Sequence, residues 1–200
     1  MSSASRQPLG QRAFHPIYAA CAEHGLPIAL HVGSEGAGTS GTATGSGFPT
    51  RYFEWHNILP THFMTQLNSF VCEGVFEKFP ALRLVLIEGG VSWLPHLIWR
   101  MDKNYKALRG QSPWLKRLPS EYVREHVRLC TQPVEEPEKP EHLAAIFDAI
   151  HAAETVMFAS DYPHWDFDAP DGTLAFLPAP LRRRILGETA AELYKLSPRS

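Results

Sequence analysis

The stretch from Thr155 to Asp168 constrains the fold more than any other part of this sequence. Its residues 156–159 form a continuous apolar run, which is typical of a strand buried on both faces. The run ends just before Asp161, and Pro163 then prevents further backbone pairing. We therefore expect Asp161 at the carboxyl end of a buried strand, which is where ligands bind in α/β sheets and barrels.

Ionisable side chains gather directly after this strand end. Asp161 is followed by His164, Asp166 and Asp168. A buried strand that ends in such a cluster is poorly suited to form a core and well suited to form a site. A second interpretation stays open, in which Asp161 caps a turn and His164 and Trp165 are surface residues.

Three further apolar runs end in a similar way. They cover residues 27–30, 82–87 and 127–131, and they are followed by His31, by Glu88 with two glycines, and by Gln132. A lone histidine in such a position is more often a structural residue than a ligand. The repeated placement of a polar group after an apolar run favours a ligand role for His31.

Segments with a helical pattern separate these runs. They cover residues 14–24, 61–78, 93–108 and 141–151, and two more close the chain at 181–186 and 189–196. Strands that alternate with helices predict right-handed crossovers and a parallel sheet.

The carboxyl ends of parallel strands lie along one edge of their sheet. His31, Glu88 and Asp161 are therefore expected to converge there. One neutral imidazole and two carboxylates are suitable ligands for a divalent metal such as zinc, manganese or iron.

Length and charge limit the other possibilities. The chain of 200 residues fits a single domain over 13–200, preceded by a flexible lead over 1–12. The formal charge of −2 does not support a nucleic-acid partner. No run approaches the roughly 20 apolar residues of a membrane span, and no signal peptide is visible, so we expect no membrane partner and a cytoplasmic location. The three cysteines lie far apart in apolar contexts, as buried thiols in a reducing compartment do.

A segment rich in glycine, serine and threonine follows His31. It contains Gly36, Gly38 and Gly41 in the spacing of a dinucleotide-binding loop, but the chain after it does not open a helix. We interpret it as a loop over the site and expect no nucleotide cofactor. His56, His164 and Trp165 are candidates for a substrate pocket.

Five motifs together resemble one known family. They are Leu30-His31-Val32-Gly33, Phe76-Glu77-Lys78-Phe79-Pro80, Glu88-Gly89-Gly90-x-x-Trp93-Leu94-Pro95, Trp99-Arg100-Met101-Asp102, and the run from Phe158 to Asp166. They are similar to the motifs of the amidohydrolase-related family, which includes the aminocarboxymuconate-semialdehyde decarboxylase-like enzymes. The resemblance spans residues 14–196 and implies a metal-dependent (β/α)8 barrel of the TIM type.

The resemblance also assigns roles. It implies that His31 is the metal-binding histidine of the fifth barrel strand. Asp161 is the aspartate at the end of the eighth strand, which binds metal and handles the proton of a metal-bound water.

The sequence departs from the family pattern at two places. Glu88 stands where better-known members carry a histidine near the metal, so the acid/base role would fall to a carboxyl group. The first-strand His-x-His motif is missing, since His15 and His24 lie on the expected first helix. The four strands match the last four β/α units, which predicts an α/β half barrel.

The resulting hypothesis is a truncated metal-dependent enzyme. It would hydrolyse or non-oxidatively decarboxylate a small carboxylated or cyclic substrate. His31 and Asp161 are its expected metal ligands, with Glu88 or His164 as candidates for a third, and Asp161 and Glu88 are its expected catalytic groups. Zinc is expected first and manganese or iron next, bound weakly because ligands are missing. A homodimer could close the barrel. The alternative is a non-catalytic remnant or interaction module with the same fold.

Overall fold

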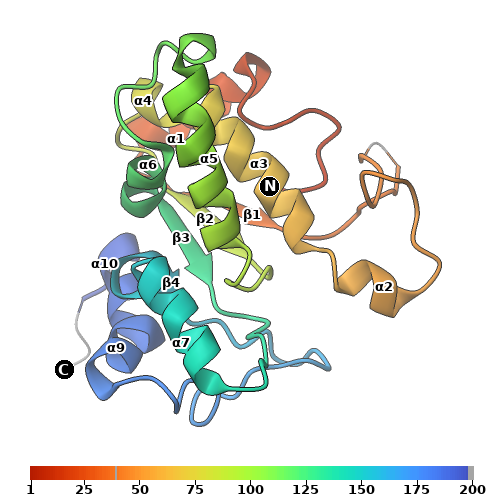
Figure 1. Cartoon of the computed structure of the whole chain (residues 1–200), viewed down its shortest axis with the longest axis vertical. Coiled ribbons are helices and arrows are strands. Elements are labelled where there is room, and N and C mark those ends of the chain that lie inside the picture. The colour runs from red at the N-terminus through yellow and green to blue at the C-terminus, as the bar shows by residue number, and fades with distance from the viewer. Residues whose placement is uncertain (39, 198–200) are drawn as a thin grey trace.

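A four-stranded parallel sheet forms the centre of the computed structural model, which describes residues 1–38 and 40–197 (Figure 1). The strands are β1 (Ile28–His31), β2 (Leu84–Ile87), β3 (Val127–Cys130) and β4 (Val156–Met157), and they lie side by side in this order. Every neighbouring pair is parallel. The expected fold class, a parallel α/β sheet of the barrel type with four β/α units, is confirmed.

Helices connect the strands and follow the last one. They are α1 (His15–Glu23), α2 (Tyr52–His56), α3 (Pro60–Cys72), α4 (Val75–Lys78), α5 (Leu94–Leu108), α6 (Pro119–His126), α7 (Pro140–Ala149), α8 (Ala152–Thr155), α9 (Ala179–Arg183) and α10 (Thr189–Tyr194). A π-helical stretch, η3 (Arg184–Glu188), joins α9 to α10. Within the described residues, no helix has both the length and the apolar character of a membrane span.

The helix expected over residues 61–78 is interrupted. Gly74 has a left-handed backbone with φ +70° and separates α3 from α4. A Cβ at this position would lie 2.3 Å from Cδ1 of Trp114, so the close approach of the indole also requires glycine. The stripe of apolar residues continues through the break, which is why the sequence pattern did not indicate it.

The two faces of the sheet bury separate clusters. On one face, residues such as Leu86 join a large core with α3, α5, α6 and α7. On the other face, Val85, Cys130 and Met157 form a small cluster, and Leu193 of α10 packs against it. We call the second face the inner face, because the crossover helices lie on the opposite side and this face would line a closed barrel.

Both edges of the sheet have backbone partners within the chain. At β1, the Ser3 amide donates to the His31 carbonyl (2.9 Å) and the His31 amide donates to the Met1 carbonyl (3.0 Å). At β4, the Phe158 amide donates to the Ile185 carbonyl of η3 (2.8 Å). These bonds protect edges that would otherwise offer free pairing groups.

The expectation of a flexible lead over residues 1–12 requires correction. Ser3 and Leu9 are fully buried, and Gln66 of α3 accepts a hydrogen bond from the Leu9 amide (2.7 Å). The segment is packed because the open edge of β1 needs hydrogen-bond partners. We therefore include it in the domain.

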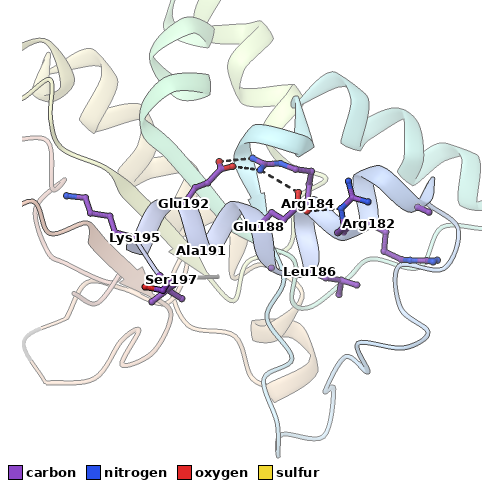
Figure 2. A pocket seen from close by; sticks show the side chains of 12 residues that line it. Arg182, Arg184, Leu186, Glu188, Ala191, Glu192, Lys195 and Ser197 are labelled. Carbon is purple, nitrogen blue, oxygen red and sulfur yellow. Dashed lines mark hydrogen bonds and ion pairs between the residues drawn. The ribbon is translucent and has the colours of Figure 1, made fainter. Parts of the chain in front are cut away.

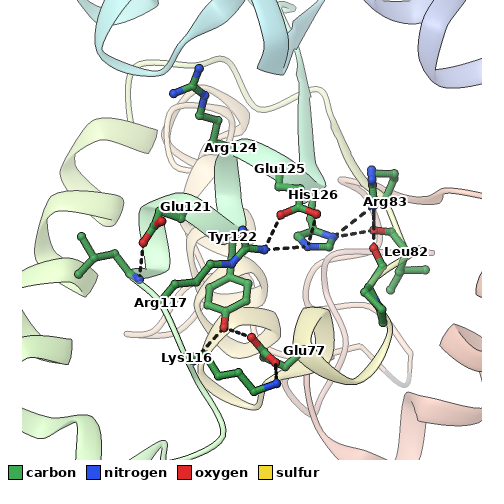
Figure 3. A network of polar contacts seen from close by, with 12 residues as sticks. Glu77, Leu82, Arg83, Lys116, Arg117, Glu121, Tyr122, Arg124, Glu125 and His126 are labelled. Atoms are coloured by element: carbon green, nitrogen blue, oxygen red, sulfur yellow. Dashed lines mark hydrogen bonds and ion pairs between the residues drawn. The ribbon is translucent and has the colours of Figure 1, made fainter.

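A buried histidine makes hydrogen-bond and stacking contacts at the amino-terminal end of the sheet (Figure 3). His126, the last residue of α6, is stacked on Phe76 with ring centroids 4.6 Å apart. Its Nδ1 donates to the Leu82 carbonyl (2.9 Å), so Nε2, 3.5 Å from the Arg117 guanidinium, is the acceptor in the neutral ring. Burial is the main cause that lowers the pKa of His126, and the hydrogen bond to Leu82 opposes the shift.

This lowered pKa predicts a loss of stability in acid. The unfolded chain takes up a proton at this ring as the pH falls through about 6.5, whereas the folded protein resists it. The contribution is therefore present above that pH and lost below it. We expect the free energy of unfolding, measured by urea titration at pH 7.5, 6 and 5, to fall less steeply in His126→Gln than in the unsubstituted protein. The exposed His142→Gln serves as the control, and equal slopes in all three proteins would contradict the assignment.

Candidate metal and catalytic site

The carboxyl ends of the strands present the predicted ionisable residues on one side of the sheet. His31 is the last residue of β1, Glu88 directly follows β2, and Asp161 follows β4 after a short extension. Glu88 and Asp161 both have left-handed backbones, with φ +67° and +56°. Such conformations are uncommon for residues other than glycine and are concentrated at functional sites.

Three of these side chains form a compact group of potential metal ligands. Glu88, Asp161 and His164 each offer one ligand atom, and these atoms lie within 4.8 Å of one another. Ligands that bind one ion at about 2.1 Å lie at most about 4.2 Å apart. Two carboxylates and an imidazole at this spacing therefore fit a divalent cation after small side-chain movements.

His31 contacts Glu88 and is not a member of the three-residue group. Its Nδ1 donates to the Val32 carbonyl (2.6 Å), which directs Nε2 toward Oε2 of Glu88 at 2.9 Å. Because neither Nε2 of the neutral ring nor a carboxylate oxygen carries a hydrogen, one proton must lie between these two atoms. A cation could replace that proton, so Nε2 of His31 lies where it could serve as a further ligand atom beside Glu88.

The surroundings raise the pKa of two members of the group, Glu88 and His164. Burial is the main cause that raises the pKa of Glu88; His31 opposes this shift, while Asp161 adds to it. The hydrogen bond to Asp161 (2.5 Å) raises the pKa of the exposed His164.

An aromatic wall stands next to the group. His56 of α2 packs against Trp165 at 5.3 Å and Tyr52 at 5.4 Å between ring centroids. Nε2 of His56 also lies 3.4 Å from Oδ2 of Asp166, at ion-pair distance but without hydrogen-bond geometry. Two predicted pocket residues, His56 and Trp165, are thus brought together from distant parts of the sequence.

Several residues of this region were not among the predicted site residues. Tyr52 lies on a helix of five residues, too short for its periodicity to be recognised. Asp166 has a buried carboxylate oxygen without a hydrogen-bond partner, and so has the amide oxygen of Gln132 at the end of β3. The Gln132 amide donates to the Asp166 carbonyl (3.4 Å). Two signals were available in the sequence: Gln132 follows an apolar run, and Asp166 belongs to the ionisable cluster after Asp161.

The second interpretation of the loop after β4, a turn at Asp161 with His164 and Trp165 on the surface, agrees with part of the structure. Trp165 is 74% exposed, and the Asp161 carbonyl accepts the His164 amide in a turn (2.9 Å). Asp161 nevertheless directs its carboxylate to His164 and lies within reach of Glu88. The turn therefore positions the side chains of the group.

The glycine-rich loop has no structure of the dinucleotide-binding type among the described residues. Gly36 is paired with Gly41 through a backbone hydrogen bond (2.7 Å), and the next helix, α2, begins only at Tyr52. No helix amino terminus follows the motif to receive a pyrophosphate.

A parallel sheet with carboxylates and imidazoles at its carboxyl edge is the architecture of (β/α)-barrel enzymes that use a metal ion. The chain belongs to the amidohydrolase family, whose model matches residues 3–196. The family resemblance deduced from the sequence motifs is confirmed. No curated protein sequence matches the chain.

Several solved structures share the fold. An amidohydrolase from Mycobacterium avium subsp. paratuberculosis K-10 is 22% identical, with a TM-score of 0.75 over 96% of this chain and 50% of that chain. The 5-carboxyvanillate decarboxylase of Sphingomonas paucimobilis is 23% identical, with a TM-score of 0.68 over 98% and 58%. A dihydroxybenzoic acid decarboxylase from Polaromonas sp. JS666, with bound manganese and the inhibitor 2-nitroresorcinol, is 20% identical, with a TM-score of 0.65 over 96% and 56%. The chain thus spans 50–58% of the length of these proteins.

Proposed function

We propose that this protein is a metal-dependent enzyme that decarboxylates a small aromatic carboxylic acid without an oxidant. The observation that carries the proposal is the group formed by Glu88, Asp161 and His164 at the carboxyl edge of a parallel sheet. Hydrolysis of a small cyclic substrate uses the same groups and is the second reaction to test. A divalent ion is the expected cofactor, and manganese is tested beside zinc because a structural relative binds it.

Each residue of the site has a defined task in this proposal. Glu88, Asp161 and His164 would hold the divalent ion, and His31 would join them through Nε2. When bound, the ion would supply Lewis-acid polarisation of the substrate oxygens. Asp161 holds His164 in place through its hydrogen bond and can accept or return a proton at the same carboxylate.

Decarboxylation needs a proton for the ring carbon that loses its carboxylate. The bond between the ring and the carboxylate breaks, carbon dioxide leaves, and the carbon receives a proton in its place. Burial raises the pKa of Glu88, which favours the protonated form of its carboxyl group. Glu88 would be the donor in this step.

The aromatic wall supports an aromatic substrate. Tyr52, His56 and Trp165 form an aromatic group beside the carboxylates, and the ring faces of Tyr52 and Trp165 are largely exposed. Stacked or edge-to-face contacts between rings contribute about 0.5–1.5 kcal/mol beyond the area that they bury. A planar ring could therefore lie against this wall while its carboxylate reaches the metal group.

The first test measures metal and activity in the same preparation. Protein purified without chelator is analysed by plasma mass spectrometry, then dialysed against manganese or zinc and assayed for carbon dioxide release from dihydroxybenzoic acids and related aromatic acids. We expect about one divalent ion per chain and release that stops when the metal is removed.

Two other outcomes distinguish the alternatives. Consumption of a cyclic amide or ester without carbon dioxide would replace decarboxylation by hydrolysis at the same site. A folded chain that binds neither metal after dialysis would contradict the proposal and favour a non-catalytic module of the same fold.

A further inference from the structure

The inner face of the sheet is covered by the chain itself. In a closed barrel, layers of side chains from all the strands fill this space. Here Val85 is fully buried, and Cys130 and Met157 are only 8% and 3% exposed. Ala190 and Leu193, both on α10, pack against this cluster, and so does Ala159 just after β4.

The course of α10 extends this cover across the sheet. Its first residue, Thr189, donates to the Ala153 carbonyl of α8, near the β4 edge (3.4 Å). Lys195 directly follows the helix, and its Nζ lies 3.7 Å from where a Cβ on Gly25 would be, in the turn before β1. The segment 189–195 therefore runs beneath the sheet from β4 toward β1.

The helix α10 is amphipathic, with apolar residues toward the inner face of the sheet and polar residues toward solvent. Ala190 and Leu193 face the sheet, whereas Glu192 lies on the solvent side and is held by Arg184 of η3 (Nη2 to Oε2, 2.8 Å) (Figure 2). Arg184 also donates through Nε to the Ala153 carbonyl (3.1 Å). The helix is thus anchored to α8 on its polar side while its apolar side seals the cluster.

A helix and a closed barrel cannot share this space. An α-helix with its side chains is about 10 Å across, close to the spacing of two packed sheets. A second half barrel that docked on the inner face would have to remove α10 first.

We propose that α10 is an intramolecular plug of the inner face, which keeps the chain monomeric by occupying the surface on which a second copy would otherwise close the barrel. The partner that fits the unplugged face is another copy of this chain, because the exposed surface would be the inner half of a parallel barrel with an apolar centre. Association then requires α10 to leave. This inference does not depend on the proposed chemistry.

Cys130 reports the position of the plug, because its thiol lies beneath α10. In a Cys21→Ala/Cys72→Ala background it is the one thiol of the chain. We expect light scattering to give the mass of one chain. We also expect Cys130 to react with Ellman's reagent on the order of 100-fold more slowly in the folded protein than in urea.

Leu193→Asp in this background tests the plug directly. A carboxylate cannot stay buried against Val85 and Met157, so α10 should leave the inner face. We expect the variant to elute as a dimer at high concentration. At concentrations low enough for it to be monomeric, Cys130 should react at least roughly tenfold faster than in the parent. Leu196→Asp, at a residue that is 60% exposed, is the matched control and should behave as the parent does.

Three results would overturn the inference. A parent that is already dimeric with a protected Cys130 would mean that a second copy covers the face. A folded Leu193→Asp variant with parental Cys130 reactivity would mean that α10 is not the cover. If circular dichroism shows that Leu193→Asp is unfolded, the milder Leu193→Ala variant decides, and it must show faster labelling than the parent for the inference to stand.

Discussion

Replacing Asp161 by asparagine is expected to remove the bound metal and to lower turnover at least about 1,000-fold, equivalent to about 4 kcal/mol of lost transition-state stabilisation. The carboxylate is a member of the ligand group and the partner of His164, and the amide cannot supply its charge. Asparagine has the same shape and tolerates the left-handed backbone at φ +56°, so the fold should be kept. Metal per chain by plasma mass spectrometry and carbon dioxide release are the two measurements.

Asp171→Asn is the matched control for this substitution. Asp171 lies in the same loop region, ten positions later, and is exposed. It should bind metal and turn over substrate as the parent does. An Asp161→Asn protein that kept both its metal and its rate would exclude Asp161 from the site.

The second large effect is expected at Glu88. Glu88→Gln removes the negative charge that lies between Nε2 of His31 and the other two members of the group. We expect the affinity for the metal ion to fall at least on the order of 100-fold. The substitution also removes the carboxyl proton that we assign to the ring carbon. Turnover should therefore stay low even when excess metal restores occupancy, which separates a proton-donating role from simple ligation.

Calorimetric titration with manganese or zinc, followed by an assay at saturating metal, measures both effects of Glu88→Gln. Glu73→Gln, at an exposed glutamate that directly follows α3, is the control and should leave affinity and rate unchanged. Full activity of Glu88→Gln at saturating metal would show that Glu88 only binds the ion. Unchanged affinity would remove it from the ligand group.

The strands and their polar ends could be predicted because each strand is a short, mostly apolar run with an ionisable or polar residue at its carboxyl end or shortly after it. His31, Glu88 and Asp161 were located in this way. Their mutual arrangement could not be predicted. The pairing of His31 with Glu88 depends on the left-handed backbone at Glu88, which nothing in the side-chain pattern indicates.

Short elements were missed for a related reason. α2 and α6 have five and eight residues, too few for a helical period to rise above chance. His164 was assigned to the pocket and was also a candidate for a third metal ligand. It lies in the candidate ligand group because the turn after β4 folds it back on Asp161. The cover of the inner face by α10 depends on tertiary packing between residues 85 and 193, which no local pattern contains.

The aromatic wall has a consequence for how such a protein can diversify. Tyr52 and His56 lie on α2, and Trp165 lies in the loop after β4, so the wall is built from peripheral segments while the ligand group is fixed by strand ends. Mutations at the exposed Tyr52 can reshape the wall without disturbing the main core, which Trp55 of the same helix contacts. The preference of the proposed enzyme for one ring substituent over another could therefore change in evolution or in laboratory selection, while the residues at the strand ends stay the same.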